Sequence, residues 1–493
     1  MALDTDDPEA GQRYWTEWIA AHTWGLGPDV AEGGGQSHPI LNPATGEALC
    51  SIRHADGADV ERAVAHGKAA SGDWAARTPR SRAELVRAVA DVLERHREEL
   101  AWLDTLDAGL PLWMMRKDAD TGVERMRMFA DLGYALTGQT IPASAGNLHL
   151  TFPEPFGVVA RIIPFNHPFM FAASKVAAPL VAGNTVVLKP SELTPLSALR
   201  MAELVEGVLP DGVLSVVHGG ADVGDALVRH REIRRIAFTG SHQVGRAIQR
   251  SAADVGVKHV SLELGGKNAM IVFPDADVDA ALTAAVKGMN FAFAGQSCGS
   301  TSRVFVHESL LAEFTERYVA AVNAVRQGMP WSPGVQIGPM VSAAQQDRAH
   351  GFVERAVAAG AHLLTGGGTP AGGGGFFVTP TVFDGVSAEM EIANEEVFGP
   401  VVALFGFSTE DEVVGAANAV EYGLTASVWT RDLSLAHRMS RRLEAGYVWV
   451  NDTSTHFPGV PFGGVKMSGI GREESADELL SYTEIKAVNL VLS

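Results

Sequence analysis

The feature that most constrains the fold is an alternation of short β-rich runs and helical stretches that begins near residue 156. The β-rich runs are "FGVVARIIPF", "NTVVLKP", "GVLSVVHGG" and "IRRIAFTGS", and each of them ends in turn-forming residues. Helical stretches such as "ASKVAAPLVAG" and "QVGRAIQRSAADV" lie between them. Strands that alternate with helices form βαβ units, so this segment predicts an α/β domain with a parallel sheet.

A second alternating segment extends from about residue 267 to 465, with "VAAVNAVRQG", "HGFVERAVAAGA" and "AHRMSRRLEAG" as helices. The chain of 493 residues is long enough for two to four domains, since a domain commonly holds about 150 residues. Two extended stretches, "NLHLTF" at 147–152 and "IKAVNLVLS" at 485–493, lie outside both alternating segments.

Two helix starts carry recognisable signals. In "SRAELVRAVADVLERHREELAWL", apolar residues recur at helical spacing, and Ser81 and Glu84 have the spacing of a capping box. This pattern predicts a helix that begins at Ser81. Thr194 followed by Pro195 likewise predicts a capped helix start.

Composition excludes several classes of protein. No apolar run approaches the roughly 18 residues that span a bilayer, and the acidic start "MALDTDDPEAGQRYW" is unlike a signal peptide. Cys50 and Cys298 are the only cysteines, so neither a disulfide framework nor a cysteine-rich zinc site can form. We therefore expect a cytoplasmic protein with no membrane partner and no bound metal.

The formal net charge of −19 argues against nucleic acid as a partner. Binding to a phosphate backbone requires a basic patch, and the sequence contains no Lys/Arg-rich run. A small anionic cofactor is compatible with this charge, because helix N-termini and a few local lysines can hold an anion.

Cys298 is the candidate nucleophile. In "FAGQSCGSTSR" at 293–303 its neighbours are mostly small and polar rather than bulky and apolar. A lone cysteine is more often buried and unreactive. Small neighbours, however, let the backbone approach a ligand and leave the sulfur accessible. Only the thiolate attacks, and a free thiol has a pKa of about 8.5, so a reactive cysteine needs such surroundings.

Six further segments concentrate glycine, proline and polar residues. They are "IIPFNHP" (162–168), "LKPSE" (188–192), "FTGS" (238–241), "ELGGK" (263–267), "EEVFGP" (395–400) and "PFGGVKMSGIGRE" (461–473). Together with "GQSC" at 295–298, and in this order, they resemble the NAD(P)-dependent aldehyde dehydrogenase superfamily of the hydrolytic, non-acylating type. The resemblance covers the chain from about residue 40 onward, and the first 35 or so residues match none of these motifs.

The resemblance implies an aldehyde dehydrogenase-like α/β fold, with two Rossmann-like α/β domains and a small β oligomerisation arm. The NAD-binding domain would comprise residues 1–136 and 156–262, and the catalytic domain residues 263–465. Residues 137–155 and 480–493 would form the arm. In the family this arm extends the sheet of a neighbouring subunit, so we expect a homodimer or homotetramer.

The resemblance also implies four catalytic roles. Cys298 would attack the aldehyde carbon to form a thiohemiacetal, and Asn166, with the backbone N–H of Cys298, would bind the resulting oxyanion. Glu263 would be the general base that activates water against the thioester. Lys175 would support proton transfer. Taken alone, Asn166 could be a turn residue, Glu263 a solvated strand end and Lys175 a residue on a helix face.

NAD is the cofactor that the resemblance implies, with NADP as an alternative. There is no G-x-G-x-x-G fingerprint, and we interpret "GGADVG" at 219–224 as a structural turn. Glu192 would bind the ribose hydroxyls and repel a 2′-phosphate, which favours NAD. Phe165 stands where the family usually has tryptophan. The residues expected at the cofactor are Phe165, Lys189, Ser191, Glu192, Thr239, Gly240, Ser241, Gly245, Leu264, Gly265, Glu396 and Phe398.

The residues expected to contact the aldehyde substrate are His167, Phe171, Phe291, Ser297 and His456. Either histidine alone could equally be a satisfied core or surface residue. Together they predict a partly polar tunnel, and the two phenylalanines would supply flat walls. This combination favours an aromatic or carboxyl-bearing aldehyde.

Three other functions remain open. A CoA-acylating semialdehyde dehydrogenase would share the nucleophile but typically lacks the hydrolytic glutamate, so Glu263 argues against it. The intact "PFN", "ELGGK" and "GQSC" set argues against a relative that reduces acyl phosphates. A catalytically inactive, enzyme-like structural protein would usually have lost Cys298 or Glu263, and both are present.

Overall fold

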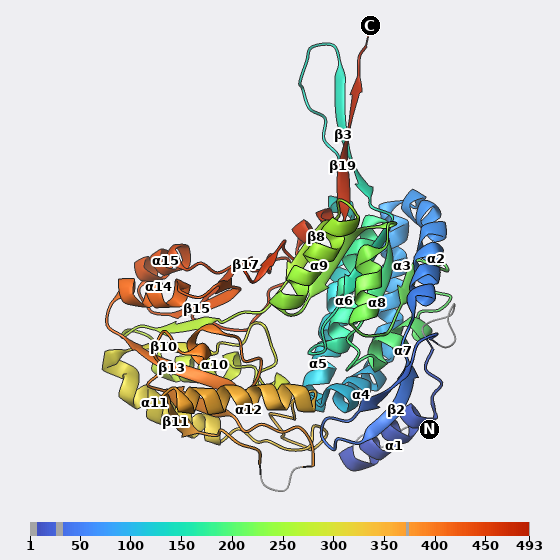
Figure 1. Cartoon of the computed structure of the whole chain (residues 1–493). Coiled ribbons are helices and arrows are strands. Elements are labelled where there is room, and N and C mark those ends of the chain that lie inside the picture. Colours follow the sequence, from blue (N-terminus) through green and yellow to red (C-terminus); the bar gives the residue numbers. More distant parts are fainter. Residues whose placement is uncertain (1–6, 26–32, 371–373, 493) are drawn as a thin grey trace.

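The computed structural model describes residues 7–25, 33–370 and 374–492. Two α/β units lie side by side, and a two-stranded antiparallel ribbon projects from the unit that contains the N-terminal helices (Figure 1). The C-terminus lies at the tip of this ribbon. Both alternating segments of the sequence therefore form α/β units, as predicted.

The first unit is built on a six-stranded sheet with the order β18-β8-β7-β4-β5-β6. All neighbouring strands pair in parallel except β18, which is antiparallel to β8. Every residue of β4 and β5 is buried, as expected for a sheet covered on both faces. The strands are β4 (Val158–Ile162), β5 (Thr185–Lys189), β6 (Leu214–Val216), β7 (Ile233–Thr239), β8 (His259–Glu263) and β18 (Gly469–Ile470).

Helices α2, α6 and α8 contact strands of this sheet, and α3, α4 and α5 pack against α6. The helices of the unit are α1 (Pro8–Ala21), α2 (Gly57–Ala76), α3 (Pro79–Arg95), α4 (Arg97–Ala108), α5 (Leu112–Leu132), α6 (Pro168–Ala182), α7 (Leu196–Leu204), α8 (Ala221–Arg229) and α9 (His242–Val255). A 3-10 turn, Gly133–Ala135, follows α5. Helix α1 lies in the N-terminal region that matched no motif, and it packs on α4 and on the strand β2 (Ala48–Arg53).

Both predicted helix starts were wrong in detail. Helix α3 begins at Pro79, and Thr78 is its N-cap, with its hydroxyl accepting from the Ser81 N–H at 3.2 Å. Proline is well suited to this first helical position because its φ is already helical. Helix α7 begins at Leu196 without a cap from its own chain neighbours. Instead the carboxylate of Asp107, on α4, accepts the Leu196 N–H at 3.1 Å.

The second unit is built on a seven-stranded sheet with the order β11-β12-β13-β10-β9-β15-β16, in which only β11 is antiparallel to its neighbour. The strands are β9 (Ala269–Val272), β10 (Arg303–His307), β11 (His362–Thr365), β12 (Thr381–Asp384), β13 (Val401–Phe407), β15 (Thr425–Trp429) and β16 (Tyr447–Val450). The helices are α10 (Val278–Gly288), α11 (Glu308–Asn323), α12 (Ala343–Ala358), α13 (Glu391–Asn394), α14 (Glu410–Asn418) and α15 (Leu433–Arg442), with a 3-10 turn at Phe291–Phe293.

Alternate residues of β9 belong to different hydrophobic cores. Met270 and Val272 join the cluster that includes Phe314 of α11 and Phe352 of α12. Ala269 and Ile271 join the cluster on the other face, with Val413 of α14 and Met439 of α15. The two-residue period of a strand thus places helices on both faces of the sheet.

The projecting ribbon pairs β3 (Leu148–Pro155) with β19 (Thr483–Leu490) in antiparallel register. These are the two extended stretches that lay outside the alternating segments. Two small sheets pair β1 (Ser37–Leu41) with β2, and β14 (Tyr422–Gly423) with β17 (Val465–Lys466). Helix α16 (Ala476–Leu480) precedes β19. In the described part of the chain, no helix has the length and apolar character needed to cross a bilayer.

Candidate active site

The nucleophile candidate Cys298 lies in a loop between the 3-10 turn Phe291–Phe293 and β10, and it is partly buried. Its side chain packs against a small cluster that includes Leu424 and Tyr447. Burial raises the pKa of the Cys298 thiol to about 12, and the nearby carboxylates of Glu396 and Glu263 add to this rise. The resting sulfur is therefore a protonated thiol.

Gly295 brings this loop close to the "EEVFGP" segment. Its φ is +70°, and a Cβ at this position would lie 2.3 Å from the carbonyl oxygen of Gly399. Only glycine fits this combination of left-handed backbone and close approach. The two segments, about a hundred residues apart in sequence, are thus neighbours at the site.

Asn166 lies between β4 and α6 and reaches the same loop from the first unit. Its Nδ2 donates to the carbonyl oxygen of Gln296 at 2.8 Å, and the residue is buried. A side-chain amide has two N–H donors, so one N–H remains for another acceptor. The "PFNHP" and "GQSC" segments are therefore joined by a direct hydrogen bond.

Glu263 is the last residue of β8, and it is buried. Neither carboxylate oxygen has a hydrogen-bond partner among the described residues. Burial, together with the charge of Glu473, raises its pKa well above the ordinary value, although Lys175 opposes the rise. A Cβ at Gly463 would lie 2.7 Å from Glu263 Oε1, so glycine leaves room for the carboxylate there.

Lys175, on α6, is buried and does not lie on an exposed helix face. Its ammonium lies 2.5 Å from the carboxylate of Glu473, which also pairs with the buried guanidinium of Arg161 on β4. Burial alone would raise the pKa of Glu473, but the two cations outweigh it and lower the pKa to about 2. The charges of this buried group, Lys175, Glu473 and Arg161, act on the carboxylate of Glu263.

The sequence reasoning missed Arg161 and Glu473. Arg161 had a signal, because a charged residue within the apolar run "FGVVARIIPF" requires a buried partner. Glu473 is the last residue of the motif "PFGGVKMSGIGRE", but nothing in the sequence indicated which cations it pairs with.

The segment "LKPSE" contains the last two residues of β5, Leu188 and Lys189, and the turn after them. Lys189 is buried, its Nζ donates to the Pro190 carbonyl at 3.2 Å and lies 3.9 Å from the carboxylate of Glu192, which is about half exposed. Burial lowers the pKa of Lys189, while the charges of Glu192 and Asp222 oppose this. Ser191 accepts the Leu193 N–H at 3.2 Å and so shapes the turn. The segment presents an amine beside an accessible carboxylate.

The residues expected at the pyrophosphate lie where β7 meets α9. Ser241 is the N-cap of α9 and accepts the Val244 N–H at 3.3 Å. Thr239 Oγ1 is buried and without a hydrogen-bond partner among the described residues. The Gly240 N–H donates to the Glu263 carbonyl at 3.0 Å. This helix start therefore lies directly beside the end of β8.

Leu264 and Gly265 continue from Glu263, and Gly245 on α9 packs against Leu264, since a Cβ there would lie 2.8 Å from Leu264 Cδ2. A Cβ at Gly265 would lie 2.0 Å from Glu396 Oε2, so glycine admits that carboxylate. Tight packing of this kind holds the "FTGS", "ELGGK" and "EEVFGP" segments together.

Glu396 and Phe398 lie between α13 and β13. The Gly266 N–H donates to Glu396 Oε1 at 3.0 Å, and burial raises the pKa of Glu396 to about 7. Phe398 has a left-handed backbone, with φ of +56°, and its ring meets that of Phe165 edge to face at 5.7 Å. A cleft of about 580 Å³ opens nearby between α9 and α12, and His242, Arg348 and Glu395 are among its lining residues.

His167 and Phe171 lie together at the start of α6. His167 Nδ1 is hydrogen-bonded with Asp118 on α5 at 2.6 Å, and its ring lies 4.1 Å from that of Phe293 and 5.2 Å from that of Phe171. The Lys175 ammonium lies 5.5 Å from the centre of the Phe171 ring. Phe171 therefore lies about one helical turn before Lys175, and His167 lies about one turn before Phe171.

His456 belongs to a separate group. Its Nδ1 is hydrogen-bonded with Glu474 at 2.9 Å, and Glu474 also pairs with Arg125 on α5 at 2.7 Å. The ring of His456 lies 4.7 Å from that of Phe462. Burial opposes ionisation of Glu474, but Arg125 and His456 lower its pKa far below the ordinary range. Asp118 and Arg125 were not predicted, and one helix thus supplies partners for both histidines.

The two remaining predicted substrate residues differ in their surroundings. Ser297 is partly buried in the nucleophile loop, next to Cys298. Phe291 is buried and belongs to the hydrophobic core of the second sheet, together with Met270 and Val304. Among the described residues, no group of three or more His, Cys, Asp or Glu side chains is arranged to hold a metal ion.

Comparison with known proteins shows which family this chain resembles. The sequence model of the Aldehyde dehydrogenase family matches residues 30–488. The protein named aldehyde dehydrogenase tropH of Talaromyces stipitatus is 45% identical over 463 residues, which cover 92% of this chain and 90% of that one. A betaine aldehyde dehydrogenase of Cereibacter sphaeroides is 42% identical, with 94% and 95% covered. The NAD+ complex of aldehyde dehydrogenase from Bacillus cereus superposes with a TM-score of 0.93 at 39% identity, covering 96% and 98%.

Proposed function

Since the chain belongs to the aldehyde dehydrogenase family, we propose that it oxidises an aldehyde to the carboxylic acid through a thioester on Cys298. The protein is an NAD(P)-dependent aldehyde dehydrogenase. The observation that carries the covalent mechanism is the hydrogen bond from Asn166 to Gln296, because it joins the expected oxyanion donor to the loop of the expected nucleophile.

The residues present fit NAD. The buried Thr239 hydroxyl, at the end of β7, has no hydrogen-bond partner among the described residues, and His242, at the start of α9, lines the cleft. Lys189 and Glu192 would hold the adenosine ribose, Ser241 the pyrophosphate and Glu396 the nicotinamide ribose. The accessible Glu192 carboxylate would repel a 2′-phosphate, so NAD is favoured over NADP. When bound, NAD supplies the two-electron acceptor that converts the thiohemiacetal into a thioester.

In the first step the Cys298 thiol passes its proton to water, and its sulfur bonds to the aldehyde carbon while the carbonyl electrons move to oxygen. Burial and the nearby carboxylates raise the pKa of this thiol, so the proton must leave before the sulfur can attack. The free N–H of Asn166 and the backbone N–H of Cys298 donate to the new oxyanion. Such preorganised donors typically contribute about 10²–10³ in rate each.

In the second half of the reaction, water attacks the thioester carbon and Glu263 accepts a proton from that water. The carboxylic acid leaves, and the thiol of Cys298 forms again. A general base works best when its pKa is near the working pH, and burial moves the pKa of Glu263 upward in that direction. Lys175, paired with Glu473, supports proton transfer at this carboxylate.

The substrate class that we propose is an aromatic or carboxyl-bearing aldehyde. Both histidines have Nδ1 engaged by a carboxylate, which orients each ring and leaves Nε2 for another partner. Phe171 adds an apolar ring beside His167. An aldehyde that combines a flat ring with a polar group would meet both features.

An assay of NADH formation against an aldehyde panel, with and without CoA, tests the reaction class. Hydrolytic oxidation predicts NADH and free carboxylic acid without CoA. Acyl-CoA as the product, with no turnover in the absence of CoA, would favour the acylating alternative. No NADH with any aldehyde would favour an inactive, structural protein.

We further propose a homodimer or homotetramer in which the β3–β19 ribbon extends a neighbouring subunit's sheet. Ile485 is 64% and Val491 78% exposed on this projecting segment, and an apolar edge of this kind is an aggregation hazard in a monomer. A monomer in sedimentation at micromolar concentration would contradict this assembly. Both cysteines are free thiols, in keeping with the cytoplasmic location that we propose.

A further inference from the structure

We propose that Asn268 is a positioning residue for the nucleophile, because its side-chain amide fixes the peptide carbonyls of Cys298 and Ser300. The inference rests on the proposed function, since it assumes that Cys298 is the attacking residue. Asn268 immediately precedes β9, five residues after Glu263, and its side chain is only 3% exposed.

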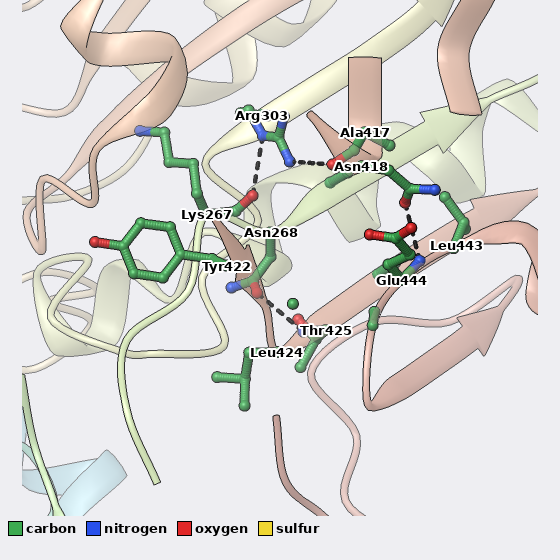
Figure 2. A pocket seen from close by; sticks show the side chains of 14 residues that line it. Lys267, Asn268, Arg303, Ala417, Asn418, Tyr422, Leu424, Thr425, Leu443 and Glu444 are labelled. Atoms are coloured by element: carbon green, nitrogen blue, oxygen red, sulfur yellow. Dashed lines mark hydrogen bonds between the residues drawn. The ribbon is translucent and has the colours of Figure 1, made fainter. Parts of the chain in front are cut away.

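The amide of Asn268 makes three hydrogen bonds to backbone groups. Its Nδ2 donates to the Cys298 carbonyl at 2.7 Å and to the Ser300 carbonyl at 2.9 Å. Its Oδ1 accepts the N–H of Thr425, the first residue of β15, at 3.0 Å, and Figure 2 shows this bond from Asn268 to Thr425. Both N–H groups of the amide are therefore engaged, and the nucleophile loop is tied to the sheet.

The nucleophile loop depends on side-chain hydrogen bonds of this kind because its backbone is not paired with a neighbouring strand. Residues 294–302 lie outside helices and strands, and Ala294 and Gly295 both have left-handed backbones. Fixing the Cys298 carbonyl fixes the peptide plane that follows the nucleophile. The Cys298 N–H has no backbone carbonyl as acceptor among the described residues, and its interaction with its own sulfur lowers the pKa of the thiol, against the effect of burial.

The surroundings fit asparagine closely. A Cβ at Gly266 would lie 2.6 Å from Asn268 Oδ1 and 2.9 Å from the Cys298 carbonyl oxygen, so no space is left beside the amide. Aspartate has the same shape but would present an oxygen to two carbonyl oxygens in place of the two N–H donors. Serine or alanine would be too short to reach both carbonyls.

Asn418 provides a matched control in the same region (Figure 2). Its Nδ2 donates to the Arg442 carbonyl at 2.8 Å and its Oδ1 accepts the Glu444 N–H at 2.9 Å. It therefore also joins two backbone groups, but neither belongs to the nucleophile loop.

The test compares Asn268→Asp, Asn268→Ser and Asn418→Ala in a Cys50→Ser background, where Cys298 is the only thiol. Four quantities are measured: the rate of the first NADH turnover per reactive thiol, the rate of Cys298 alkylation by iodoacetamide, the Kd for NAD, and Tm. Both Asn268 variants should slow the first turnover about 10- to 100-fold, because small misplacements of a reacting group cost rates of this order. They should also change the alkylation rate, while the Kd for NAD stays as in the parent.

Asn418→Ala should lower Tm and leave both rates unchanged. The positioning role would be overturned if the Asn268 variants had the same first-turnover rate per reactive thiol as the parent. In that case only Tm, or the fraction of Cys298 thiols that react, would be reduced. An equal slowing by Asn418→Ala would overturn it as well. Turnover that survives Cys298→Ala would refute the proposed function itself, whereas an inactive Cys298→Ala enzyme beside fast Asn268 variants refutes only this inference.

Discussion

The side-chain amide of Asn166 donates a 2.8 Å hydrogen bond to the carbonyl of Gln296, two residues before Cys298. This bond connects the turn after β4, in the first unit, to the nucleophile loop of the second. The two groups that we expect to bind the oxyanion are thereby held on one framework.

Asn166→Ala should lower kcat by about 10²–10³, the usual cost of removing one oxyanion donor. The physical reason is that charge develops on the former carbonyl oxygen only after the sulfur attacks. Steady-state kinetics, combined with iodoacetamide titration of Cys298 to count reactive thiols, separate this effect from misfolding. A kcat close to that of the parent, with all thiols reactive, would remove Asn166 from oxyanion binding.

Glu263→Gln should slow hydrolysis of the thioester while sparing its formation, because glutamine cannot accept the water proton. Stopped-flow absorbance should show a burst of NADH close to one per active site, followed by a slow steady state. The parent enzyme, measured in parallel, gives the amplitude of the NADH burst that is expected when hydrolysis of the thioester is not slowed. Equal steady-state rates for parent and variant across neutral pH would exclude Glu263 as the base.

The Glu473 ion pairs predict how stability depends on pH. Its pKa is lowered to about 2 in the folded chain, whereas an unfolded glutamate has a pKa of about 4.3. The stabilisation is therefore fully present above about pH 4.3 and is lost as pH falls toward 2; by linkage it is on the order of 3 kcal/mol.

Glu473→Gln should consequently lower the free energy of unfolding at pH 7, and the difference from the parent should shrink as the pH falls. Urea denaturation at several pH values between 3 and 7 measures this. Gln is matched in size, so it isolates the charge. A difference that stays constant over this range would contradict the assigned pairing with Lys175 and Arg161.

Substrate polarity is tested through His456. We expect a higher kcat/KM for benzaldehyde, a carboxybenzaldehyde and a semialdehyde than for hexanal, because a site with polar donors penalises substrates that leave them unpaired. The His456→Phe substitution should reduce the ratio of kcat/KM for these aldehydes to kcat/KM for hexanal. If hexanal is the preferred substrate and His456→Phe changes nothing, the polar-tunnel proposal is wrong.

Much of this fold could be predicted from the sequence, because alternating β-rich and helical runs are local signals. The helix starts were less predictable, since the cap of α7 comes from Asp107, 89 residues away in sequence. Asn166, Glu263 and Cys298 lie in recognisable motifs. The residues that support them could not be predicted in this way. Lys175 and Glu473, for example, are 298 residues apart in sequence, and only the packed fold brings their buried charges together.

Mass spectrometry of the trapped intermediate shows directly whether a thioester forms on Cys298. Glu263→Gln enzyme is mixed with NAD and benzaldehyde, quenched in acid during the slow phase and digested. We expect a benzoyl group on the peptide that contains Cys298, none on the peptide that contains Cys50, and none at all in Cys298→Ala enzyme, which should be inactive. An unmodified Cys298 peptide, or turnover by Cys298→Ala, would contradict the covalent mechanism.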